Sequence, residues 1–130
     1  MRFIPAILTL CIAATPAVAF RAENGMIVDQ TGPTEFTVAS RIGRGPTEYW
    51  CAAGDYAIRV LGVPGRTAIY RVTPPPRQGG QDITFSLDPA IGTAETGISR
   101  FGSGRLEKGI SAAIAQASYC NNFDLIPFFD

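Results

Sequence analysis

The side chains able to carry out chemistry form a restricted set, because the 130-residue sequence contains no histidine. Without an imidazole there is no Ser-His-Asp or Cys-His nucleophile, and the commonest general base and zinc ligand are missing. The remaining reactive or charged groups are three cysteines, eleven acidic residues and eleven basic residues.

Paired carboxylates are the remaining route to hydrolysis, which needs two carboxyl groups about 5 to 10 Å apart across a cleft. Glu48 and Asp55 are seven residues apart, which is two helical turns or about 10.5 Å. Asp55 can also pair with Arg59 four residues on, as on a solvated helix face. The other acidic residues are too scattered for a calcium-type loop. We therefore expect no catalytic residues, no metal site and no cofactor, with a carboxylate-based hydrolase-like enzyme as the alternative.

Arginine offers a second kind of chemistry, because its planar guanidinium binds carboxylate and phosphate in a bidentate manner. Arg77 stands in the proline-stiffened loop Pro74–Gln81, and Arg71 lies in an expected strand just before it. Arg105 ends the stretch Gly102-Ser103-Gly104-Arg105, which is a candidate anion nest. We name Arg71, Arg77 and Arg105 as candidate binding residues.

Charge and composition narrow the class of protein. The formal net charge is +0, with 46% hydrophobic and 17% charged residues. Such a chain lacks the positive field on which nucleic-acid binding depends, so we expect no nucleic-acid partner. The composition and length are typical of one small globular domain.

The first nineteen residues have the pattern of a secretory signal peptide. Arg2 is followed by an apolar run over residues 3–14, then by Pro16 and the triplet Ala17-Val18-Ala19. This pattern predicts cleavage before Phe20. The run is shorter than the roughly 20 apolar residues of a membrane span, so we expect no stable membrane insertion after cleavage. The expected division is a signal peptide over 1–19 and a single domain over 20–130, located in the periplasm or secreted.

Cleavage would remove Cys11 and leave two cysteines, Cys51 and Cys120. An even number of cysteines in an exported chain predicts a disulfide, because the compartment is oxidising. A bridge between these positions would stabilise the fold by about 4 kcal/mol on the loop-closure argument.

One long helix is expected over residues 46–61. Pro46 suits its first turn, and Gly62 and Pro64 end it. Glu48, Asp55 and Arg59 form one charged stripe and nearly all other positions are apolar, which predicts a buried helix with one solvent-exposed edge. Gly54 at its centre is unfavourable for a helix, so we expect a backbone or an aromatic ring to pack closely there.

Short strands are expected around this helix. Residues 35–39 alternate with period two, as do 82–87, where Ile83, Phe85 and Leu87 should point inward and Thr84 and Ser86 outward. Residues 67–73 should pair with 82–87 as a hairpin, and Asn24-Gly25 should form a tight turn.

The carboxyl-terminal half is less clear from its pattern. Residues 88–105 predict a long surface loop. Residues 106–119 fit a helix or a strand, and we favour a strand. The expected fold class is α+β: one long buried helix packed on a small antiparallel sheet, in a single domain with one disulfide.

The run from Tyr49 to Ala57, together with Ile69-Tyr70-Arg71 and the proline-rich turn, resembles small bacterial exported proteins of unassigned function. The resemblance spans positions 45 to 90. It implies export and a paired cysteine, and it carries no catalytic residues over to this chain.

These observations favour an exported, non-enzymatic envelope or secreted protein that binds another protein or an anion through its loops. Its partner would be another envelope or secreted protein. Besides the hydrolase-like alternative, the Pro74–Gln81 loop could enter a pocket on a secreted hydrolase and inhibit it, since a rigid loop loses little entropy on binding.

Overall fold

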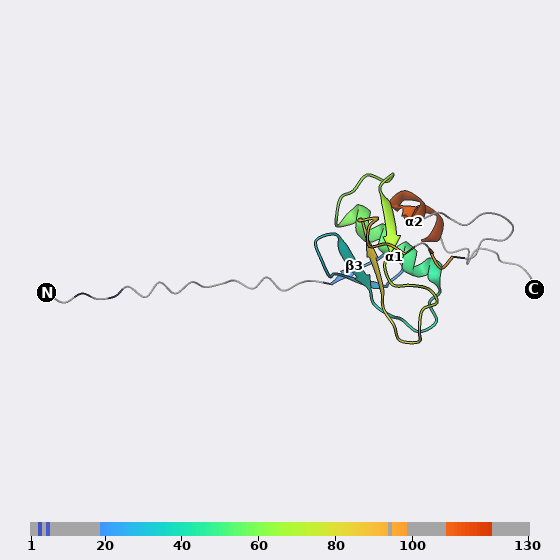
Figure 1. Cartoon of the computed structure of the whole chain (residues 1–130), viewed down its shortest axis with the longest axis horizontal. Coiled ribbons are helices and arrows are strands. Elements are labelled where there is room, and N and C mark those ends of the chain that lie inside the picture. Colours follow the sequence, from blue (N-terminus) through green and yellow to red (C-terminus); the bar gives the residue numbers. More distant parts are fainter. Residues whose placement is uncertain (1–2, 4, 6–18, 94, 99–108, 121–130) are drawn as a thin grey trace, which may run out of the picture.

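The computed structural model describes residues 3, 5, 19–93, 95–98 and 109–120 (Figure 1). The described elements share one hydrophobic core. In chain order they are β1 (Phe20–Arg21), β2 (Ile27–Gln30), β3 (Glu35–Val38), α1 (Pro46–Arg59), β4 (Ala68–Arg71), β5 (Ile83–Ser86), β6 (Ile110–Ser111) and α2 (Ala112–Tyr119).

The strands form one antiparallel sheet in the order β1-β2-β3-β5-β4-β6. The expected strand in 35–39 and the expected hairpin of 67–73 with 82–87 are confirmed as β3 and as the β4–β5 pair. The turn at Asn24-Gly25 is also confirmed. Gly25 has a φ of +83° there, and its N–H donates to the carbonyl of Ala22 at 2.8 Å.

Helix α1 begins where the sequence predicts and ends at Arg59, two residues earlier than expected. Pro46 occupies the first turn, and the Glu48 carboxylate accepts a hydrogen bond from the backbone N–H of Gly45 at 2.7 Å. This contact satisfies a donor that the helix itself leaves unpaired.

The core lies between α1 and one face of the sheet. Phe36, Val38, Ile83 and Phe85 are buried on this face, and Tyr49, Trp50 and Tyr56 meet them from the helix. The Phe36 and Tyr56 rings have centroids 4.8 Å apart, as do the Trp50 and Phe85 rings. The long helix packed on an antiparallel sheet confirms the expected α+β class.

Helix α2 corrects the strand expected over 106–119. Only Ile110–Ser111 is a strand, the helix follows at once, and 106–108 lie outside the described residues. The Ser111 side chain accepts a hydrogen bond from the N–H of Ile114 at 3.3 Å, which caps the new helix. The pattern favours a strand because a single buried helix needs a sheet wide enough to cover it. Only two residues extend the sheet here, and α2 packs against α1 instead (Figure 1).

The close approach expected at Gly54 occurs at this helix contact. A Cβ at Gly54 would lie 2.7 Å from the Cβ of Ala115, 2.7 Å from the N of Gln116 and 3.0 Å from the O of Ala112. The group that packs against Gly54 is therefore the backbone of α2, together with the methyl group of Ala115.

Two polar residues are buried against expectation. Asp55, placed on the solvent-exposed edge, has no exposed surface, and Ser86, expected to point outward, has none either. Each is buried with partners: Asp55 accepts three hydrogen bonds, and the Ser86 hydroxyl accepts one from the N–H of Asp88 at 2.9 Å. Buried polar groups are tolerated when such bonds are made.

Cys51 and Cys120 form the expected disulfide, with an S–S distance of 2.07 Å and a sequence separation of 69. It joins the first half of α1 to the residue that ends α2. No helix among the described residues is long and apolar enough to cross a membrane.

Candidate functional site

Arg71, at the end of β4, is a buried cation. Only 2% of its surface is exposed. Its Nε donates to the carbonyl of Thr73 at 2.7 Å and its Nη1 to the carbonyl of Thr96 at 3.3 Å. Its Nη2 is buried without a hydrogen-bond partner, and no carboxylate among the described residues forms an ion pair with it. The two N–H donors on Nη2, out of the five of the guanidinium, therefore have no described acceptor.

A second guanidinium lies within electrostatic range of the first. Burial lowers the pKa of Arg71, and the positive charge of Arg77 lowers that pKa further. An arginine nevertheless keeps its proton in a protein. The structure therefore brings two of the three candidate binding residues together, and both are positive.

Arg77 is turned back onto the domain. Its guanidinium carbon lies 5.1 Å from the centre of the Tyr49 ring. Its Nη1 donates to the Ser40 hydroxyl at 3.2 Å and to the carbonyls of Gln78 and Gln81 at 3.3 and 3.1 Å. These contacts hold the Pro74–Gln81 loop against the start of α1. The third candidate, Arg105, lies outside the described residues.

The chain that covers Arg71 comes from the region expected to be a surface loop. Its described parts, 88–93 and 95–98, contain no helix or strand. The carbonyl of Thr96 also accepts a hydrogen bond from the Trp50 indole at 2.9 Å, and Gly97, with a φ of +75°, lies against the guanidinium. A Cβ at Gly97 would collide with the Nη1 of Arg71 and would lie 3.3 Å from the Cβ of Pro75. We name Arg71, Arg77, Trp50, Pro75 and the Thr96–Gly97 segment the guanidinium site.

The two carboxylates considered for hydrolysis are both engaged elsewhere. Glu48 caps α1 and pairs with Arg44 at 2.6 Å. Asp55 accepts from the N–H of Glu23 at 2.9 Å, from Arg59 at 3.0 Å and from the Gln116 amide at 3.1 Å. This carboxylate therefore ties the amino-terminal segment, α1 and α2 together. The geometry gives it a structural role.

One group of metal-binding residue types occurs among the described residues. The Glu23 carboxylate lies within 4.8 Å of the sulfur atoms of Cys51 and Cys120. The two sulfur atoms are bonded to each other. Since a thiolate is the form of cysteine that binds metal, the disulfide form offers none here.

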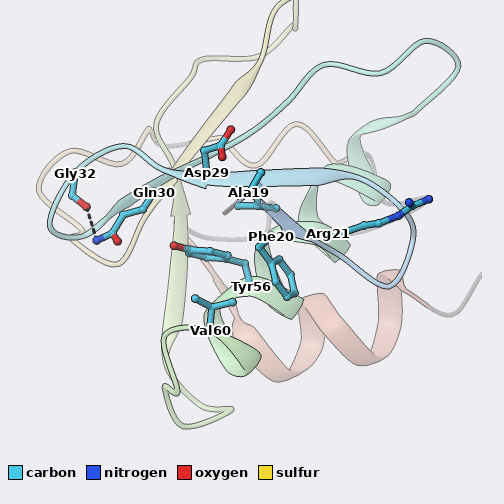
Figure 2. A pocket seen from close by; sticks show the side chains of 9 residues that line it. Ala19, Phe20, Arg21, Asp29, Gln30, Gly32, Tyr56 and Val60 are labelled. Carbon is cyan, nitrogen blue, oxygen red and sulfur yellow. Dashed lines mark hydrogen bonds between the residues drawn. The ribbon is translucent and has the colours of Figure 1, made fainter. Parts of the chain in front are cut away.

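A hollow of about 860 Å³ lies at the opposite edge of the sheet (Figure 2). Its lining includes Phe20, Val28, Tyr56 and Val60, with Asp29 and Gln30 at one side. The Phe20 and Tyr56 rings meet edge to face with centroids 5.7 Å apart. Burial raises the pKa of Tyr56, and the negative charge of Asp29 raises that pKa further.

Sequence reasoning did not single out this hollow. A usable signal was present, since the Asn24-Gly25 turn predicts a hairpin that brings Phe20 back beside the residues around Val28. The pairing of Phe20 with Val28 is what the structure has.

Comparisons with protein-family models, with curated proteins and with solved structures found no match. Function is therefore inferred from the geometry of the guanidinium site and the hollow.

Proposed function

We propose that this protein is an exported, non-enzymatic binding protein that takes up an oxyanion, a carboxylate or a phosphate, at the guanidinium site. The observation that carries the proposal is the Nη2 of Arg71, buried without a partner on a side chain that is 2% exposed. Buried charges in proteins are normally paired, because removing an ion from water costs several kcal/mol. An incoming anion would supply the missing partner.

The surroundings of Arg71 favour an anion over a neutral ligand. The only charged side chain that perturbs Arg71 among the described residues is Arg77, which is also positive. Two guanidinium groups that repel each other are both stabilised by an anion placed near them. The planar guanidinium fork also matches the oxygen spacing of both carboxylate and phosphate in a bidentate manner.

Binding requires a local movement. The Nη2 is out of contact with solvent, and Gly97 lies against the neighbouring Nη1. The Thr96–Gly97 segment is held by carbonyl contacts to Arg71 and Trp50 rather than by strand pairing. A shift of this segment opens the site without disturbing the sheet.

The Pro74–Gln81 loop has less support as an inhibitory finger. Arg77 donates within its own loop and to Ser40 and lies over Tyr49. A finger that enters another protein's pocket would have to give up these contacts. For this reason we place the binding role of Arg77 in the guanidinium site.

The oxyanion could come from a small molecule or from another protein, and the two sources imply different functions. An acidic side chain of another envelope or secreted protein presents the same chemistry as a free phosphate or carboxylate. We test both by titrating the disulfide-bonded protein in a calorimeter with inorganic phosphate, with citrate and with an acidic peptide rich in Asp and Glu.

Arg71→Lys keeps the charge but removes the Nη2, so we expect it to weaken the binding of whichever anion binds the wild type by at least about tenfold. Arg77→Gln should weaken the same anion to a smaller extent. Arg66→Gln is the matched control, because Arg66 is exposed and has no described partner. Wild-type protein that binds none of the three probes, or equal weakening by Arg66→Gln, would refute the proposal.

The proposal also includes export, which the disulfide and the leader-like segment support. Its test is separate: the protein expressed with residues 1–19 is recovered from an osmotic-shock fraction and its mass is measured. Recovery outside the cytoplasm with those residues removed is the expected result. Full-length protein retained in the cytoplasm would contradict export while leaving anion binding to its own test.

A further inference from the structure

The first residue expected after cleavage is already part of the fold. Phe20 pairs with Val28 in β1, its ring packs edge to face on Tyr56, and the Arg59 guanidinium lies 5.2 Å from the ring centre. Chain ends normally order only where such contacts hold them. The expected cleavage point is therefore at the start of an ordered strand.

The register of β1 and β2 determines what faces this cleavage point. Phe20 lies opposite Val28 and Arg21 opposite Ile27. Continued by one residue, the same register places Ala19 opposite Asp29. The main-chain nitrogen of Phe20 therefore lies between the levels of Val28 and Asp29. Ala19, Phe20 and Asp29 all line the hollow, and Figure 2 shows Ala19 and Asp29 at its upper edge.

Asp29 is available to pair with a cation. Its side chain makes no hydrogen bond or ion pair with any other residue in the described part of the chain, and it is exposed. Its charge is felt in the hollow, where it contributes to the raised pKa of Tyr56.

The other charged groups near Phe20 are directed elsewhere or neutralised. The Arg59 guanidinium is paired with Asp55 at 3.0 Å. The Arg21 guanidinium extends toward Gly25, where a Cβ would lie 3.8 Å from its Nη2, and Figure 2 shows it pointing away from Asp29. Tyr56 is uncharged at neutral pH. Asp29 is therefore the unpaired charge closest in register to the Phe20 nitrogen.

We propose that cleavage after Ala19 creates an ammonium group on Phe20 that pairs with the carboxylate of Asp29 and fixes the new amino terminus at the edge of the sheet. Water is the co-reactant: its oxygen ends on the Ala19 carbonyl carbon as a carboxylate, and the Phe20 nitrogen leaves as an ammonium. The inference depends on the export that we propose above and is independent of anion binding.

The test measures the reactivity of the new α-amino group in protein recovered after export. An amine held as ammonium reacts slowly with an acylating reagent, because only the neutral form is a nucleophile. We expect the α-amino group to be acylated about three-fold more slowly at pH 7 in the wild type than in Asp29→Asn, as a solvent-exposed ion pair would give. The ε-amino group of Lys108, acylated in the same sample, is the internal reference.

Two further variants separate charge from shape. Asp29→Glu should restore the slow reaction, and Glu95→Gln, which removes an exposed carboxylate on a different loop, should leave the wild-type rate unchanged.

A pH series gives a second readout. Pairing with a carboxylate would raise the pKa of the ammonium in the folded state, so its stabilising effect is fully present below the unfolded-state pKa of about 8 and is lost as the pH rises through the higher folded-state pKa. The stability difference between wild type and Asp29→Asn should therefore shrink between pH 6 and pH 9.

Equal acylation rates in the wild type and Asp29→Asn would overturn the inference, as would a processed chain that begins at another residue. Neither result would affect the anion titration at Arg71. Conversely, a protein that binds no anion can still show the Asp29 effect, so the two proposals fail separately.

Discussion

The substitution Gly54→Ala tests the packing of the two helices most directly, because local and tertiary effects oppose each other. Gly54 lies in the middle of α1. In an isolated helix, alanine at such a position is more stable than glycine by about 1 kcal/mol. A change judged on helix propensity alone would therefore stabilise the protein.

The contacts predict the opposite result. The added methyl group would lie 2.7 Å from both the Ala115 Cβ and the Gln116 nitrogen. Carbon atoms in contact are usually about 3.5 to 4 Å apart, so α2 would have to move by about 1 Å. The disulfide and the bond from Gln116 to Asp55 oppose this movement. Overpacking of this kind costs about 1 to 3 kcal/mol. We expect the upper end of this range because the movement is opposed, so after subtracting about 1 kcal/mol of helix propensity the net loss is about 2 kcal/mol.

The assay is equilibrium unfolding in urea without reductant, followed by the fluorescence of the single tryptophan. The expected loss corresponds to a fall in Tm of roughly 10 °C for a chain of this size. Gly54→Ala combined with Ala115→Gly removes one of the clashing methyl groups and should recover part of the loss. A Gly54→Ala protein more stable than the wild type would show that the helices are not in this contact.

Three further predictions concern single interactions. Reducing the disulfide should lower the free energy of unfolding by about 4 kcal/mol, because a long loop in the unfolded chain is released. The same urea midpoint in the presence and in the absence of reductant would contradict this. Asp55→Ala should cost about 3 kcal/mol, since it removes a buried carboxylate and leaves three donors without their acceptor. Arg59→Ala should cost no more than about 1 kcal/mol, because its side chain is 52% exposed. Equal losses of the two variants in urea unfolding would show that Asp55 is not the anchor. Asp29→Asn should lower the pKa of Tyr56, because the negative charge that disfavours the phenolate is removed. Burial still keeps that pKa above its ordinary value. An unchanged midpoint in a titration of the tyrosine NMR signals would show that the charge of Asp29 does not act on Tyr56.

The parts of the fold that sequence alone predicts are those where one signal dominates. The helix starting at Pro46 has a proline, an apolar run and terminating glycines, and the strands around Phe36 and Phe85 alternate cleanly. The disulfide follows from counting the cysteines of residues 20–130, the expected mature chain. None of these depends on knowing what lies across the core.

The predictions that failed concern positions decided by a distant partner. Asp55 looks solvated because its neighbours on the helix stripe are charged, and it is buried because Glu23 and Gln116 supply donors from other elements. The pattern of the 110–119 segment fits both the 3.6-residue period of a helix and the two-residue period of a strand. The helix is favoured because small residues let this segment approach Gly54. The same limit applies to the candidate site: the arginines can be named from the sequence, but the unpaired Nη2 of Arg71 depends on the chain around Thr96.

Among the described residues, the two outermost strands of the sheet, β1 and β6, are each only two residues long. A sheet edge attracts other chains through its row of free backbone donors and acceptors, so such short strands leave little for a neighbouring molecule to extend. Growth of the sheet into fibres is therefore disfavoured at both margins, even though the four inner strands are rich in β-branched and aromatic residues.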